Sequence, residues 1–177
     1  MALDHPSVLR VAAALANAGH HANITALNDA ARTAREAAQG LGIEVGQVAS
    51  SIVFGIAAEP EATPLLVITS GQHKVDTHRV AEFLGVDALL RADADFVRRW
   101  SGFAIGGVSP VGWQAENTVE LSVTGHPQQL QILVDTALNN WDEIWAAAGH
   151  PHTVFPTSFA ELVRMTGGTP FDAGVKN

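Results

Sequence analysis

The residues best suited to chemistry form one glycine-rich stretch, Phe103-Ala-Ile-Gly106-Gly107-Val108-Ser109-Pro110-Val-Gly112. Adjacent glycines let the backbone adopt positive φ and approach a bound group without interference from a Cβ atom. Pro110 fixes the exit of the turn and favours an extended Ser109. Such a loop can direct successive N–H groups at one oxygen, so it predicts an anion or oxyanion site, with Gly107 at positive φ. The alternative is a tight structural corner between two strands.

Histidine, of which the chain holds eight, is the second residue type that could support chemistry. His150 and His152 alternate, so on a strand their rings would point the same way, and a distant carboxylate could complete a metal site. No His-x-x-x-His or Glu-x-x-His pattern accompanies them. We therefore interpret both as polar rim residues beside Pro151, and we expect neither a metal nor a cofactor.

Several catalytic patterns are missing from the chain. It has no Gly-x-Ser-x-Gly elbow and no Gly-x-x-x-x-Gly-Lys-Ser/Thr loop, which argues against a serine hydrolase and a P-loop enzyme. Gly102-x-x-x-Gly106-Gly107 is not a dinucleotide fingerprint, because no helix is predicted to follow it. Zero cysteines exclude disulfides, thiolate catalysis and cysteine-zinc sites.

Length and composition indicate the class of protein. With 177 residues and 47% hydrophobic content, the chain suits a single domain over residues 1–177. No apolar run approaches the ~20 residues that span a bilayer, and the N-terminus shows no signal-peptide pattern. We therefore expect a cytoplasmic protein that makes no contact with membranes.

The charge distribution limits the kind of nucleic-acid partner. A formal net charge of −8 argues against a protein that wraps DNA or any long nucleic-acid backbone, but it permits contact with one RNA end. Residues 112–177 are rich in acids, whereas residues 73–100 are balanced. We therefore assign the contacts with phosphate to the basic residues of the balanced stretch, Lys74, Arg79, Arg91, Arg98 and Arg99.

Periodicity and capping patterns predict five helices. Capping boxes at Thr33 and Ser158 mark two of the N-termini, and an aspartate can cap two others. The helices are predicted over residues 6–18, 33–42, 77–84, 93–102 and 158–167.

The strands are short, apolar and separated by turn residues. Ser51–Phe54 and Leu65–Thr69 should form an antiparallel hairpin with both faces covered. The other candidates are 24–27, 87–91, 119–123, 130–134, 144–148 and 152–155. The tail from Thr169 to Asn177 is expected to be frayed. Helices and strands are interleaved without regular βαβ spacing, so the fold class is α+β (mixed α/β) with a strongly curved mixed sheet.

Several motifs together resemble the YbaK/aminoacyl-tRNA synthetase-associated domain family. The similarity is collinear from about Thr33 to Gly168, and its pieces are Gly46-Gln47-Val48-Ala-Ser50-Ser51-Ile-Val-Phe54, Leu65-Leu-Val-Ile-Thr-Ser70-Gly71, Val75-Asp76, Leu84-Gly85 and the glycine-rich stretch. The resemblance implies an editing domain, either free-standing or inserted in prolyl-tRNA synthetase, which hydrolyses the ester between a wrong amino acid and the 3′ end of a tRNA. It also implies a barrel-like mixed sheet surrounded by helices.

The resemblance also assigns site residues. Gly106 to Pro110 matches the family's Gly-x-x-x-Pro loop, so the amides of Gly106 and Gly107 would be oxyanion donors. Substrate-binding positions would be the remaining loop residues and the end of the second hairpin strand, namely Ser70, Gly71, His73, Val108, Ser109 and Pro110. Ser50 stands where many members carry a lysine associated with substrate binding and activity. The chain also lacks tyrosine, so the N-terminal tyrosine of some members is missing.

These features predict direct attack of water on the ester, because no nucleophilic dyad is visible. The ribose hydroxyl of the tRNA terminus could orient that water, and Ser50 could donate a hydrogen bond or only form part of the wall. Two alternatives remain open. One is a binding module that lost catalysis with the lysine and docks on a tRNA or a synthetase; the other is a metal-dependent small-molecule enzyme that uses His150 and His152.

Overall fold

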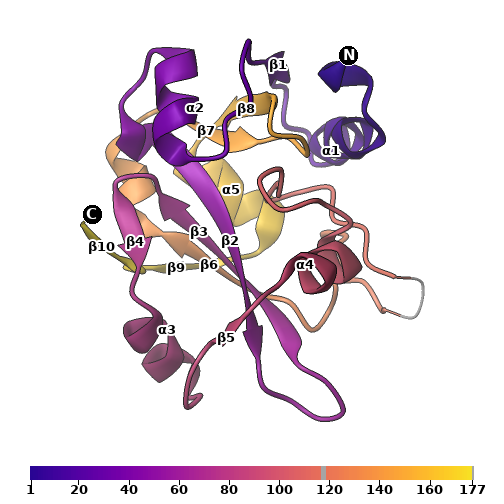
Figure 1. Ribbon diagram of the computed structural model, residues 1–177, viewed down its shortest axis with the longest axis vertical. Helices are drawn as coiled ribbons and strands as arrows, with labels where there is room; N and C mark the ends of the chain where they lie inside the picture. Colours follow the sequence, from indigo (N-terminus) through magenta and orange to yellow (C-terminus); the bar gives the residue numbers. More distant parts are fainter. Residues whose placement is uncertain (117–118, 177) are drawn as a thin grey trace.

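The computed structural model describes residues 1–116 and 119–176 as helices packed around one large mixed sheet (Figure 1). This arrangement confirms the predicted mixed α/β class. The α-helices of the described chain are α1 (Pro6–Asn17), α2 (Ala34–Leu41), α3 (Thr77–Leu84), α4 (Ala94–Ser101) and α5 (Phe159–Thr166). The strands are β1 (Thr25–Ala26), β2 (Val48–Ile56), β3 (Thr63–Ser70), β4 (His73–Val75), β5 (Leu90–Arg91), β6 (Gln131–Asp135), β7 (Ile144–Ala147), β8 (Thr153–Thr157), β9 (Thr169–Phe171) and β10 (Gly174–Lys176).

The helix ends follow from local side chains, as predicted. The side chains of Thr33, Asp76, Asp93 and Ser158 each accept a hydrogen bond from the backbone N–H three residues later. Each of these four helices then ends at a glycine in the left-handed conformation, a backbone region that disfavours other residues. Short helices of eight residues are thereby fixed at both ends.

The sheet is organised around the pair formed by β2 and β3. These two strands are antiparallel over their whole length, which confirms the predicted hairpin. The strand order is β1-β8-β7-β2-β3-β6-β9, and β5 pairs with the far end of β2. β7 joins β2 and β6 joins β3 in parallel, so the sheet is mixed. The described strands pair along an open path, and the barrel-like closure implied by the resemblance stays a prediction.

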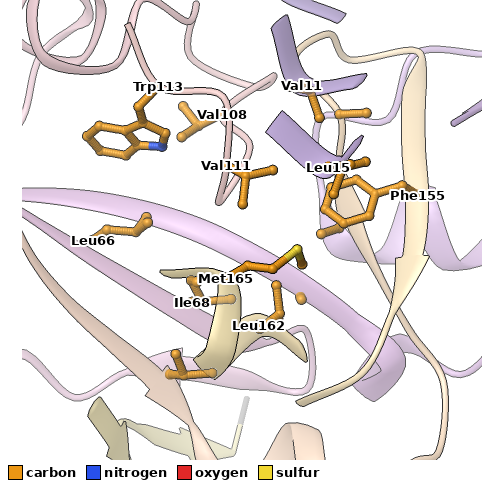
Figure 2. Packing of buried hydrophobic residues seen from close by; sticks show 14 of the residues in the cluster. Val11, Leu15, Leu66, Ile68, Val108, Val111, Trp113, Phe155, Leu162 and Met165 are labelled. Atoms are coloured by element: carbon orange, nitrogen blue, oxygen red, sulfur yellow. The ribbon is translucent and has the colours of Figure 1, made fainter. Parts of the chain in front are cut away.

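Both faces of β3 are buried, as its continuous apolar sequence predicts. Leu66 and Ile68 pack in the main core, whereas Leu65 and Val67 belong to a second cluster on the opposite face. The main core also holds residues from α1, α5, β8 and the glycine-rich loop; Figure 2 shows Val11, Leu15, Leu66, Ile68, Val108, Val111, Trp113, Phe155, Leu162 and Met165.

Two predictions about strands are wrong. Residues 119–123 form no strand and make only an isolated bridge between Leu121 and Pro127. Val123 is fully exposed and Leu121 about half exposed, so this apolar run packs against too little to be held in a sheet.

The C-terminal tail is not frayed, because β9 pairs with β6 and β10 pairs with β4. Ala173 between them is completely buried, and this contact anchors the tail; Asn177 lies outside the described residues.

None of the helices in the described ranges is both long and apolar enough to cross a membrane. The longest of them, α1, has 12 residues, whereas a membrane-spanning helix needs about 20.

The glycine-rich loop is attached to the core beyond its exposed tip. The Trp113 Nε1 group donates to the Ser109 carbonyl at 2.7 Å, and the His126 ring lies 2.7 Å from the Pro110 carbonyl through Nε2. A carbonyl can only accept, so Nε2 carries a proton, and because the pKa of His126 is lowered by burial the ring is neutral and Nδ1 accepts from the Thr124 hydroxyl at 2.9 Å. His126 is therefore a neutral, buried support for the loop.

Burial lowers the pKa of His126, and the hydrogen bond to Pro110 offsets only part of that effect. An unfolded histidine takes up a proton near pH 6.5. Below that pH the unfolded chain binds more protons than the folded one. The contribution of the neutral His126 to the free energy of unfolding is therefore fully present above about pH 6.5. It is lost as the pH falls towards the lower pKa of the folded state.

We therefore expect the melting temperature to fall more steeply between about pH 7.5 and pH 5.5 in the wild type than in the His126→Gln variant. Glutamine can still donate to the Pro110 carbonyl but has no titration in this range. The other histidines are common to both proteins, so the difference between the two pH profiles isolates His126. Parallel profiles from calorimetry would contradict the role given to His126.

Candidate active site

A cleft of about 430 Å³ lies at the middle of β2. Its walls come from β2, β7, β8, the segment that leads into α2, and the tip of the glycine-rich loop. Most of the side chains that line it are small or aliphatic, including Ala34, Ala37, Leu41, Val53, Ala92, Val97, Ile105, Val108, Ala147 and Val154. The cleft is therefore an apolar pocket of a size suited to a small molecule or to the end of a larger one.

The cleft exists because β2 has a gap in its pairing. On the side away from β3, β7 pairs with Val48 and Ala49, and β5 pairs with Phe54 and Gly55. Residues 50–53 have no strand partner on this side within the described parts of the chain. These residues line the cleft, and β2 is only partly buried there although it is covered at both ends.

The pairing with β3 determines which backbone groups face the cleft. The Gly71 N–H donates to the Val48 carbonyl at 2.8 Å, so Val48 belongs to a hydrogen-bonded pair. In an antiparallel ladder such pairs alternate with pairs that make no bond to each other. Ser51 and Val53 therefore direct their N–H and C=O groups away from β3, into the cleft.

Side chains also alternate along β2, so Ser50 and Ser51 lie on opposite faces. Ser50 shares its face with Val48, which packs against α2. Ser51 shares its face with Ala49 and Val53, which pack in the main core together with Val108 of the glycine-rich loop. Ser51 is therefore on the side of the sheet where the loop lies.

The tip of the glycine-rich loop is a turn closed by a hydrogen bond of 3.1 Å from the Gly107 N–H to the Ala104 carbonyl. Gly106 has φ +94°, the positive value that a type II turn requires at its third position. Gly107 does not adopt the positive φ that the sequence predicts. It is required instead for close approach, because a Cβ atom there would lie 3.0 Å from the His150 Cα.

The structure brings together some of the predicted site residues. Ser50, Gly106 and Val108 line the cleft. Gly107 is buried behind the tip, and its N–H is engaged in the turn. Ser109 and Pro110 are buried in the core, where their carbonyls accept the hydrogen bonds that support the loop. Among the described contacts, the N–H groups of Gly106 and Val108 have no hydrogen-bond partner.

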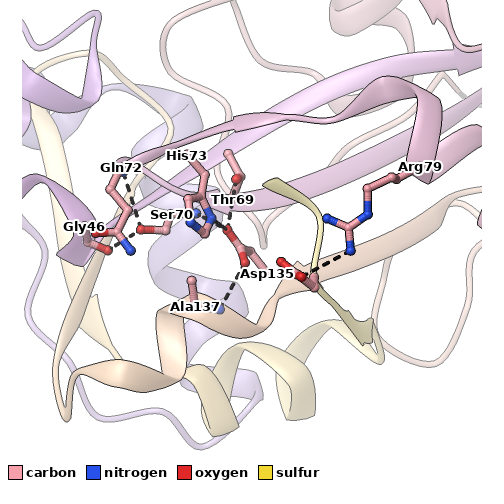
Figure 3. A network of polar contacts seen from close by, with 9 residues as sticks. Gly46, Thr69, Ser70, Gln72, His73, Arg79, Asp135 and Ala137 are labelled. Carbon is pink, nitrogen blue, oxygen red and sulfur yellow. Dashed lines mark hydrogen bonds and ion pairs between the residues drawn. The ribbon is translucent and has the colours of Figure 1, made fainter. Parts of the chain in front are cut away.

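Ser70, Gly71 and His73 are not among the residues that line the cleft. Ser70 and His73 contact Asp135, which is completely buried (Figure 3), whereas the Gly71 N–H bonds to the Val48 carbonyl. The Oδ2 atom of Asp135 accepts hydrogen bonds from the Ser70 N–H at 3.0 Å, the Thr69 hydroxyl at 3.1 Å and His73 Nδ1 at 2.8 Å. Ser70 also donates through its hydroxyl to the Gly46 carbonyl at 2.7 Å. This network joins the ends of β3 and β6 and accounts for the polar character of these residues.

Arg32 is the one charged residue among the described side chains that line the cleft. It is exposed, and the N–H of its neighbour Ala31 donates to the Pro151 carbonyl at 2.8 Å, which fixes the segment across the cleft entrance. By contrast, Arg79 pairs with Asp172, and Arg99 pairs with Glu61 and lies near Glu116.

The histidines near the loop form a small cluster beside the cleft. The ring centroids of His150 and His152 are 5.4 Å apart, and those of His5 and His150 are 5.2 Å apart. Burial lowers the pKa of His150, and the charges of His5 and His152 lower it further. No group of three or more histidine, cysteine, aspartate or glutamate side chains in residues 1–116 and 119–176 is placed to hold a metal ion.

Arg32 and Ser51 are two of the polar cleft residues that sequence reasoning did not select. Ser51 stands next to the selected Ser50, but the choice between them depends on which face of β2 meets the loop. The position of Arg32 depends on the hydrogen bonds of residues 27 and 31 to the β7–β8 connection, which join positions over 100 residues apart. No local pattern carries that information.

Comparisons with known proteins agree on one family. The family model of the aminoacyl-tRNA editing domain matches residues 28–165. A proline–tRNA ligase of Limosilactobacillus fermentum is 32% identical over 64% of this chain, and that of Geobacter sulfurreducens is 24% identical over 85%. The chain spans only 19% and 25% of the length of these two ligases.

A solved structure described as a candidate trans-editing enzyme for prolyl-tRNA synthetase is also similar. It shares 35% sequence identity with this chain and superposes with a TM-score of 0.79, covering 97% of this chain and 98% of the other. By sequence and by fold, this chain belongs to the aminoacyl-tRNA editing domain family.

Proposed function

We propose that this chain is an aminoacyl-tRNA deacylase, which hydrolyses the ester between a wrong amino acid and the 3′ end of a tRNA. It would act in trans as a single domain over residues 1–177, in the cytoplasm where translation takes place. The observation that carries the proposal is an apolar cleft of about 430 Å³ bordered by the tip of a glycine-rich loop. The similarity to a candidate trans-editing enzyme for prolyl-tRNA synthetase supports action in trans.

The loop would stabilise the developing oxyanion through its backbone. Gly106 and Val108 both line the cleft, and their N–H groups make no hydrogen bond to the described residues. The N–H of Gly107 closes the turn, so its role would be to hold Gly106 and Val108 in place. Removal of one donor from an oxyanion hole typically costs about 3–4 kcal/mol of transition-state stabilisation.

The attacking nucleophile would be water. Arg32 is the one titratable side chain among the described residues of the cleft wall, and an arginine remains protonated. The cleft walls therefore supply no general base, and the neighbouring ribose hydroxyl of the tRNA would orient the water. Ser50 lies on the wall at the position of the family's lysine, where a neutral hydroxyl contributes no charge.

The partner would be the 3′ end of an aminoacylated tRNA, and a synthetase could present it. A substrate of this kind carries phosphates, whereas the protein has a formal net charge of −8. A cation at the cleft entrance would favour its approach, and Arg32 has that position. Of the cations named from the sequence, Arg79 and Arg99 are engaged with carboxylates.

The direct test offers a panel of mischarged tRNAs to the purified protein and measures the release of each amino acid. At least one mischarged tRNA should be hydrolysed faster than its spontaneous rate, and the matched, correctly charged tRNA should not. Binding without release from any member of the panel would favour the alternative, a binding module that lost catalysis together with the lysine.

Gly106→Ala should slow deacylation by at least about tenfold, because the strained backbone would move the loop donors. The substitution places a Cβ at φ +94°, but its nearest neighbour is Pro151 at 3.8 Å, so the fold should lose only about 1–2 kcal/mol. Gly85→Ala is the matched control: this glycine has φ +71°, no atom within 4 Å, and a position at the end of α3. We expect the Gly106→Ala and Gly85→Ala variants to have similar melting temperatures, with deacylation slowed only in Gly106→Ala. Equal deacylation rates in the two variants would mean that the loop is only a structural corner.

Arg32→Ala should reduce kcat/KM for a mischarged tRNA by about tenfold, the value of one charge-assisted hydrogen bond. The slope of log kcat/KM against log salt should become shallower by about 0.7, the effect of one phosphate contact fewer on a single strand. Arg35→Ala provides the control, because Arg35 is exposed in the first turn of α2, three residues after Arg32, but does not line the cleft. Equal losses for the two variants would contradict a specific contact at Arg32.

A further inference from the structure

Ser51 has a buried hydroxyl that is not satisfied by the protein. Its Oγ atom is shielded from solvent and has no hydrogen-bond partner among the described residues, although Ser51 is one of the residues that line the cleft. A buried hydroxyl without a partner typically costs about 1–3 kcal/mol, and such groups in native proteins usually have a functional reason. The cleft that Ser51 lines is the adjacent space in which such a partner would lie.

The backbone of the same residue has unused hydrogen-bonding capacity. Ser51 lies in the gap between the partners β7 and β5, and its N–H and C=O point away from β3. Val53 repeats this arrangement two residues further on. The cleft therefore presents a hydroxyl and two backbone carbonyls along one edge of β2.

These groups suit a cation that donates hydrogen bonds. An aminoacyl group on a tRNA carries its charge on the α-amino nitrogen, which has three N–H donors when protonated. No aspartate or glutamate is found among the described residues that line the cleft. An ammonium group that enters the cleft can therefore be satisfied only by neutral oxygens, and Ser51 offers the unpartnered ones.

On the basis of the proposed function, we infer that Ser51 is a substrate-binding residue that holds the α-ammonium group of the aminoacyl ester. Its Oγ and the carbonyls of Ser51 and Val53 accept hydrogen bonds from that group. Ser51 lies on the face of β2 that meets the glycine-rich loop, whereas Ser50 faces α2. The ammonium would thus be fixed at β2 while the ester carbonyl lies at the loop.

Ser51→Ala should affect activity without lowering stability. Ser51→Ala removes a hydroxyl that has no partner in the protein, so the melting temperature should stay the same or rise. The same variant should lose about tenfold in kcat/KM for a mischarged tRNA that the wild type hydrolyses. A serine with a purely structural role would show the opposite pattern, with lower stability and unchanged activity.

The decisive experiment compares this mischarged tRNA with its N-acetylated form, in which the amino group is neutral and sterically blocked. The wild type should prefer the free amine by about tenfold or more. Ser51→Ala should reduce this preference to within about threefold, because it slows the free-amine substrate and leaves the acetylated one nearly unchanged. Ser122→Ala, at a serine that does not line the cleft, is the control and should retain the wild-type preference.

The inference would be overturned if the wild type did not distinguish the two substrates. It would also be overturned if the Ser51→Ala variant kept the wild-type preference, or if both serine variants lost the preference equally. Failure of the proposed function is a separate result. In that case the wild type would hydrolyse neither form of any mischarged tRNA, whereas the inference about Ser51 is tested only by the ratio between two substrates that are hydrolysed.

Discussion

The cleft depends on the uneven pairing of β2. One side of this strand is bonded to β3 along its whole length, which fixes its position, and the other side is bonded only at its two ends. An unpaired strand edge is normally an aggregation hazard, because its N–H and C=O groups can pair with another chain. Here residues of α2, the β7–β8 connection and the glycine-rich loop line the cleft at the gap, so a short polar edge lies inside an apolar hollow.

The second requirement is a loop that keeps its shape without a ligand. Only Ala104, Ile105 and Gly106 at the tip are exposed, and the following residues are buried. The indole of Trp113 and the ring of His126 hold consecutive carbonyls, and Gly107 allows the loop to lie directly against the backbone at His150. Donors fixed in this way need no reorganisation as charge develops, which is the main source of electrostatic catalysis.

Local structure was more predictable from the sequence than the site. Capping side chains and terminal glycines define α2 to α5, and apolar composition defines β2 and β3, because these signals act within a few residues. The prediction of a frayed C-terminal tail is wrong because β9 and β10 are held by partners distant in the sequence, β6 and β4. The contacts of Ser70 and His73 with the buried carboxylate of Asp135 could not be predicted either, because they join positions more than 60 residues apart.

An uncharged residue, Ser50, lines the cleft at the middle of β2, which affects how a charged substrate would be held. A cation on the middle of β2 would bring charge into the cleft, where desolvation is costly unless a partner is present. In this chain the charge is at the entrance, on Arg32, and the wall offers uncharged oxygen and nitrogen groups instead. Phosphate and ammonium would then be recognised at different depths, the phosphate near solvent and the ammonium at the edge of β2. A cleft of this kind would select its substrate by the position of its polar groups, because Arg32 is the one titratable side chain among the described residues of its walls and it stays protonated near neutral pH.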